Sequence, residues 1–133
     1  MVISRLDHLV LTVADLDVTC SFYSEVLGMR VVEFANGRKA LQFGNQKINL
    51  HQKGKEFEPK ASVPVPGSAD LCFIAETSVE TVLEELNNKG VNIVSGIVER
   101  TGATGPILSV YLRDPDMNLI EISNYKQEGA LNT

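Results

Sequence analysis

Four polar residues interrupt the apolar strand patterns of this chain at matching places, and together they have the chemistry of a metal site. His8 and Asp70 each begin one apolar stretch, and Asn49 and Glu121 each lie between aliphatic residues in another. Burying a carboxylate or an unpaired imidazole costs free energy unless a partner compensates for it. Imidazole nitrogens and carboxylate oxygens are common ligands of divalent cations, so a shared metal ion is one such partner.

Each of these residues also has an ordinary structural interpretation. His8 alone fits a hydrogen-bonded strand histidine, and Glu121 alone fits a solvated residue at a sheet edge. Asp70 alone fits the end of the turn formed by residues 66–68. Their joint placement at matching positions is what favours a metal site over these interpretations.

The matching positions come from an internal repeat. The segment that begins at Asp7 aligns without a gap with the segment that begins at Ala69, which places His8 on Asp70. In each copy the hydrophobic pattern changes from alternation to helical spacing and back, which predicts the order β-α-β-β-β. We expect strands over 8–13, 29–34, 39–43 and 47–51 in the first copy, and over 70–75, 91–94, 107–112 and 119–123 in the second.

The helix of each copy follows its first strand. In the first copy, Asp15 or Asp17 offers an N-cap. In the second copy, Thr77-x-x-Glu80 has the spacing of a capping box. Gly28 and Gly90 then stand where each helix needs a left-handed residue to end it.

The chain of 133 residues is expected to form a single α+β domain over 1–126. Its two modules span about 4–51 and 69–125, joined by the Pro- and Gly-containing linker 52–68. A four-stranded sheet with one helix leaves a face uncovered, so neither module is expected to be a domain by itself. Residues 127–133 are expected to form a flexible tail.

Composition limits the partners. Lys and Arg number 12 against 17 Asp and Glu, for a net charge of −5, so nucleic acid is not an expected partner. No apolar run approaches the about 18 residues of a membrane span, and no signal peptide is evident, which predicts a cytoplasmic protein with no membrane partner. Cys20 and Cys72 lack C-x-x-C spacing and are expected to be free, buried thiols.

Three motifs together resemble the vicinal oxygen chelate superfamily, which includes glyoxalase I, extradiol dioxygenases and fosfomycin-resistance proteins. They are LDHLVLTV from Leu6, FYxxxLGM from Phe22 and DPDxNLIE from Asp114. The resemblance covers residues 4–125 and is nearest to glyoxalase-domain-containing protein 5-like members, on the segments 53–67 and 100–106. It implies paired βαβββ modules whose sheets form a curved, mixed-sheet cup around one divalent metal ion.

By position, His8 and Glu121 match the usual His and Glu ligands of that superfamily. Asp70 stands where most members have a second His, and Asn49 stands where glyoxalase I typically has Glu. Asp is still a metal ligand, whereas Asn is a weak one, so His51 on the same face is an alternative fourth ligand. The resemblance leaves the metal open among Ni, Zn, Mn and Fe.

The resemblance implies a lactoylglutathione lyase-like enzyme. A small oxygenated substrate would pass through a metal-stabilised enediolate, with Glu121 or Asp70 as the base. Tyr111 and Ser109, which alternate onto one strand face, are expected to contact substrate together with Asn49, although they also fit ordinary strand residues. The alternatives are an Fe(II)-dependent extradiol-type dioxygenase and a non-catalytic small-molecule-binding module, and a homodimer is expected for each.

Overall fold

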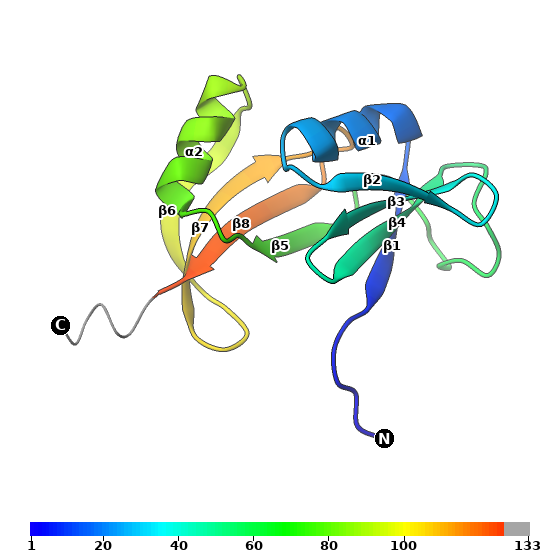
Figure 1. Ribbon diagram of the computed structural model, residues 1–133, viewed down its shortest axis with the longest axis horizontal. Helices are drawn as coiled ribbons and strands as arrows, with labels where there is room; N and C mark the ends of the chain where they lie inside the picture. The colour runs from blue at the N-terminus through cyan, green and yellow to red at the C-terminus, as the bar shows by residue number, and fades with distance from the viewer. Residues whose placement is uncertain (127–133) are drawn as a thin grey trace. The chain divides into compact units, whose positions relative to one another are not determined.

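The computed structural model describes residues 1–126, which form two four-stranded sheets with one helix beside each (Figure 1). Residues 127–133, for which a flexible tail is predicted, lie outside the described residues. The chain divides into two compact units. The first unit holds Met1–Ala69 and Asp114–Asn118, and the second holds Asp70–Arg113 and the segment from Leu119.

In the first unit, β1 runs parallel to β4, and the other neighbouring strands are antiparallel in the order β1-β4-β3-β2. The α+β class and the β-α-β-β-β order are therefore confirmed for the first copy. The elements are β1 (His8–Val13), α1 (Leu16–Glu25), β2 (Arg30–Phe34), β3 (Arg38–Phe43) and β4 (Gln46–Gln52).

The second unit repeats this arrangement, with β5 parallel to β8 and the order β5-β8-β7-β6. The last three strands of each copy form an antiparallel meander, which confirms the repeat at the level of topology as well as sequence. The elements are β5 (Asp70–Ile74), α2 (Val79–Asn88), β6 (Ile93–Thr101), β7 (Pro106–Arg113) and β8 (Leu119–Tyr125).

Alternation along the strands separates an apolar face from a polar face in the first sheet. Leu11, Leu41 and Ile48 are buried on one face, the face on which α1 places the fully buried Tyr23. Asp15 begins α1 as its N-cap, because its side chain accepts a hydrogen bond from the backbone N–H of Val18 at 3.1 Å. One of the two predicted caps is thus confirmed.

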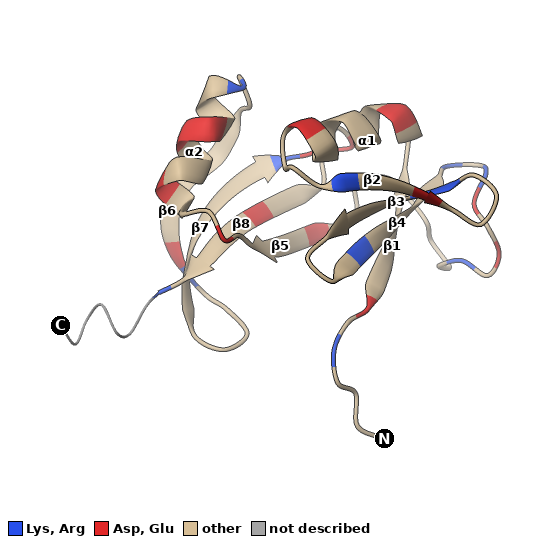
Figure 2. Cartoon of the chain, viewed as in Figure 1, with Lys and Arg blue, Asp and Glu red and all other residues tan. Residues whose placement is uncertain are grey.

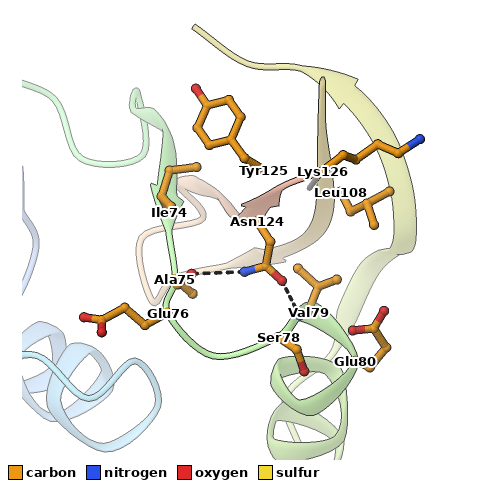
Figure 3. Close-up of a pocket in the computed structure, with 10 residues that line it drawn as sticks. All are labelled: Ile74, Ala75, Glu76, Ser78, Val79, Glu80, Leu108, Asn124, Tyr125 and Lys126. Atoms are coloured by element: carbon orange, nitrogen blue, oxygen red, sulfur yellow. Dashed lines mark hydrogen bonds between the residues drawn. The ribbon is translucent and has the colours of Figure 1, made fainter. Parts of the chain in front are cut away.

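The predicted capping box of α2 is wrong by one residue. The N-cap is Ser78, whose hydroxyl accepts from the Thr81 backbone N–H at 3.3 Å. The Thr77 carbonyl accepts from the side-chain amide of Asn124 at 2.9 Å, so Thr77 is bonded to β8 as the residue before the cap. The same amide accepts from the backbone N–H of Val79 at 2.7 Å, a contact that holds the start of α2 against β8 (Figure 3).

Strand β6 is longer than the four residues predicted, because it continues to Thr101. Shifts in its register with β7 occur between Ile93 and Ser95 and between Ser95 and Val98. These bulges break the alternation that a sequence pattern detects, whereas pairing with β7 keeps the strand extended through them.

The DPDxN motif forms a turn of the first unit in which Asp114 and Asn118 are buried. The Asp114 carboxylate accepts from the Tyr23 hydroxyl at 2.6 Å, from the backbone N–H groups of Asp116 and Asn118, both at 2.9 Å, and from the Asn118 side chain at 2.8 Å. Asn118 in turn accepts from the Ala69 backbone N–H at 2.8 Å. The most specific motif of the resemblance thus has a structural role, which its sequence alone did not reveal.

The Tyr23 hydrogen bond predicts how stability depends on alkaline pH. Burial is the main reason that the pKa of Tyr23 lies far above its ordinary value, and the hydrogen bond to Asp114 adds to this increase. This stabilisation is complete below the unfolded pKa of about 10 and declines as pH rises above it, because only the unfolded tyrosine then loses its proton. We expect urea unfolding across about pH 8–11 to show an added loss of up to about 1.4 kcal/mol per pH unit, absent in Tyr23→Phe. Parallel pH curves for the two proteins would contradict this.

None of the described helices has the length and apolar character that a membrane crossing requires. Lys and Arg residues are scattered over the elements of both units and do not line any single helix or strand (Figure 2).

Candidate functional site

One face of the second sheet gathers polar side chains around Glu121. In the register, Glu121 lies beside Cys72 of β5 on one side and Tyr111 of β7 on the other. Asp70 lies two residues before Cys72 and therefore points to the same face, about 8 Å diagonally from Glu121 between Cα atoms. Two carboxylates at this spacing can reach one cation.

A chain of hydrogen bonds orients the Glu121 carboxylate. Ser109 donates to Glu121 Oε2, the Ser109 and Ser123 hydroxyl oxygens are 2.7 Å apart, and the Cys72 sulfur is 3.3 Å from the Ser123 oxygen. Each hydroxyl has one hydrogen, and that of Ser109 goes to the carboxylate. The Ser123 hydroxyl, whose oxygen is also 3.5 Å from Glu121 Oε2, can donate to Ser109 or to Glu121 itself. The hydrogen bonds therefore end at the Glu121 carboxylate.

The Cys72 thiol keeps its hydrogen at neutral pH. Partial desolvation raises the pKa of the thiol, and the hydrogen bond with Ser123 opposes this shift. Both cysteines are free, as predicted, and Cys20 is buried. The prediction that Cys72 is buried is wrong, because its position in β5 shares the polar face with Asp70 and Glu121 and is exposed.

Tyr111 places a phenol on the same face. Burial is the main reason that the pKa of Tyr111 is raised; the Arg100 hydrogen bond opposes the shift. The Arg100 guanidinium carbon lies 5.6 Å from the centre of the Tyr111 ring. The phenol is therefore protonated at neutral pH and can act as a hydrogen-bond donor.

The polar face of the first sheet carries His8 and Asn49 with the same diagonal relation. Asn49 of β4 pairs with Val10 of β1, and His8 lies two residues before Val10. In the second sheet Asp70 likewise lies two residues before Cys72, which pairs with Glu121. His8 Nδ1 is 2.9 Å from Asp7 Oδ1, which leaves Nε2 available; metal-binding histidines commonly have such a carboxylate partner. The Asn49 side-chain oxygen is buried and has no hydrogen-bond partner among the described residues.

His51 lies farther along the same face, beside Thr12. Thr12 lies four positions after His8 along β1, a distance of about 13 Å. That separation is too large for the His8 and His51 imidazoles to share one ion at metal–nitrogen distances of about 2 Å. Of the two predicted candidates for the fourth ligand, Asn49 is therefore the better placed relative to His8.

The donors on each sheet suit a divalent cation. Over residues 1–126, no group of three or more His, Cys, Asp or Glu side chains could hold a metal ion. The first unit offers an imidazole nitrogen and an orphaned amide oxygen, and the second offers two carboxylates. Each of these pairs has the donor chemistry of ligands to a divalent cation.

Two parts of this arrangement were missed by the sequence analysis. Ser123 shares a face with Glu121, so its spacing of two residues was a usable signal for the hydrogen-bond chain. The linker was predicted only to connect the modules, whereas it packs on the first sheet, where the Phe57 and His51 ring centres are 5.7 Å apart.

The chain is similar over most of its length to known proteins. The model of the Glyoxalase/Bleomycin resistance protein/Dioxygenase superfamily matches residues 5–122. Virulence protein STM3117 of Salmonella typhimurium is 63% identical, over 94% of this chain and 87% of its own. Glyoxalase domain-containing protein RDO1 of Mycosarcoma maydis is 60% identical, over 93% of this chain and 70% of its own.

Solved structures agree with these sequence relations. The crystal structure of STM3117 has a TM-score of 0.94 and covers 95% of this chain and 100% of that one, at 63% identity. A lactoylglutathione lyase from Agrobacterium tumefaciens shares the fold, with a TM-score of 0.69 at 24% identity and coverage of 91% and 93%. The nearer likeness to glyoxalase-domain-containing protein 5-like members stays a prediction. The chain belongs to the Glyoxalase/Bleomycin resistance protein/Dioxygenase superfamily, also called the vicinal oxygen chelate superfamily.

Proposed function

We propose that the protein is a metal-dependent lyase or isomerase of small oxygenated substrates, and that His8, Asn49, Asp70 and Glu121 hold one divalent cation. The observation that carries this proposal is the matching diagonal pair on each sheet, with an unpaired buried oxygen on Asn49 and an oriented carboxylate on Glu121. When bound, the cation would supply Lewis-acid stabilisation of negative charge on adjacent substrate oxygens.

The charges of the four donors favour a particular kind of cation. Asp70 and Glu121 would balance its two positive charges, while His8 and Asn49 are neutral ligands. Three of the four donor atoms are oxygens, a set that suits Mn²⁺ better than the softer alternatives among Ni, Zn, Mn and Fe.

The chain's own residues would then move and hold the proton. Glu121 is the base that removes a proton from the carbon next to the substrate carbonyl, and Ser109 fixes the carboxylate through Oε2 so that its position is set before substrate arrives. The protonated phenol of Tyr111, beside Glu121 in the register, would donate to a substrate oxygen. Asp7 orients the His8 ring through Nδ1.

The dioxygenase alternative has less support. An Fe(II) facial triad needs two histidines and one carboxylate on the same ion. The chain has two histidines, His8 and His51, and the register of β1 and β4 separates them by about 13 Å along the strands.

The test is proton exchange with solvent. Metal-loaded protein is incubated in deuterated water with the hemithioacetal of an α-ketoaldehyde, and NMR follows deuterium at the carbon that bears the abstracted proton. We expect product formation or exchange that depends on Mn²⁺. Metal binding without either would support the non-catalytic binding module instead, and oxygen uptake with a catechol and ferrous iron would support the dioxygenase.

A further inference from the structure

A cavity lies under the linker of the first unit, beyond the residues assigned to the cation. Residues 59–61 of the linker form one side, and the polar face of β1 and β4 forms the other. Its volume is about 460 Å³, which is within the usual range for small-molecule pockets. The lining residues are Val10, Thr12, His51, Pro59, Lys60 and Ala61.

The linker is held in place over this cavity. Its first residue beyond β4, Lys53, donates its backbone N–H to the Val13 carbonyl at 2.8 Å. Phe57 packs edge-on against His51, and the Arg38 guanidinium carbon lies 3.9 Å from the centre of the Phe57 ring. These contacts fix the linker before a ligand binds, which lowers the entropy cost of binding.

The cavity contains polar groups that have no partner. His51 is only 9% exposed, and within residues 1–126 neither its ring nitrogens nor the Thr12 hydroxyl makes a side-chain hydrogen bond. Either ring nitrogen can hydrogen-bond to a ligand that supplies the matching group. The Lys60 ammonium adds a positive charge at the same cavity.

The charges around the cavity limit the charge of its ligand. Lys60 forms an ion pair with Glu58, Glu56 also lies near His51, and the other nearby cation is Arg38, stacked on Phe57. Two cations and two carboxylates leave this region close to neutral. A singly charged ligand fits that balance better than a doubly charged phosphate.

We propose that this cavity binds the carboxylate of a short-chain acid, with hydrogen bonds from Thr12, His51 and Lys60 and with Val10, Pro59 and Ala61 against its alkyl part. The proposal deepens the proposed function. It rests on that function in one respect, because the acid is identified as the class of substrate on which the enzyme acts. It assigns His51 to substrate recognition, and it leaves Asn49 as the fourth ligand of the cation.

The experiment titrates metal-free protein with butyrate and follows the histidine ring nitrogens by NMR and the affinity by calorimetry. We expect saturable binding that shifts the His51 nitrogens and leaves those of His8 unchanged. Butyramide, which has the same shape without the charge, should bind at least about tenfold more weakly. Lys60→Met should lower butyrate affinity about tenfold and Thr12→Val about fivefold. The exposed linker variant Lys55→Met is the matched control and should leave the affinity unchanged.

Repeating the titration with Mn²⁺ separates this proposal from the proposed function. Butyrate binding in a protein that takes up no Mn²⁺ would support the cavity and overturn the metal-dependent function. Mn²⁺ uptake without butyrate binding, or butyrate binding that Lys60→Met and Lys55→Met weaken equally, would overturn the cavity proposal alone.

Discussion

Replacing Asp114 with alanine is expected to lower the free energy of unfolding by about 3 kcal/mol or more, the largest stability loss we expect from a polar substitution in this chain. Asp114 is only 3% exposed, and its carboxylate accepts from four groups. Alanine would leave the Tyr23 hydroxyl and the Asn118 amide buried without this acceptor, at about 1–3 kcal/mol for each unsatisfied group.

Urea denaturation at neutral pH measures this loss directly. Asp15→Ala is the control, because it removes an exposed helix cap that also accepts from a backbone N–H, and it should cost about 1 kcal/mol. A loss for Asp114→Ala no greater than that of the control would contradict the structural role assigned to the DPDxN turn.

The largest effect on activity is expected from Glu121→Gln. Glutamine keeps the shape of the side chain and an oxygen that accepts from Ser109, but it removes both the base and one negative charge from the cation site. Loss of a general base alone typically costs 10²–10⁴-fold, so we expect turnover of the hemithioacetal to fall by about 10³-fold or more. Stability should change little, because the Ser109 hydrogen bond is retained.

The matched control for this substitution is Glu99→Gln. Glu99 lies on β6 of the same unit and forms an exposed ion pair with Lys126, so its loss should leave turnover unchanged. Turnover in Glu121→Gln within a few-fold of the unsubstituted protein would rule out Glu121 as the base.

Much of the fold could be predicted because both copies of the repeat show the same periodic spacing of hydrophobic residues. Side chains point alternately to the two faces of a strand, so residues two positions apart share a face. The placement of Asn49 and His51 on one face therefore followed from the sequence. The helix ends were also largely visible, since Gly28 and Gly90 have the expected left-handed backbone, each with φ of +71°. These features depend on local sequence, which a single chain displays fully.

The features that escaped prediction depend on contacts between distant segments. The cap of α2 is Ser78 and not Thr77, and Asn124 of β8 bonds to the Thr77 carbonyl and to the Val79 backbone N–H at the start of this helix. The burial of Asp114 depends on Tyr23, which is far away along the chain. No pattern of local spacing contains these pairings, so the candidate site could be outlined from sequence but its supporting hydrogen bonds could not.

The central claim is that the protein binds one divalent cation through the ligands proposed above, and a metal titration tests it most directly. Metal-free protein is titrated with Mn²⁺, and electron paramagnetic resonance counts the free ion. We predict one bound ion per chain, with the affinity lowered at least about 100-fold by His8→Ala in the first unit and likewise by Asp70→Asn in the second. Two ions per chain, or an affinity that survives either substitution, would contradict it.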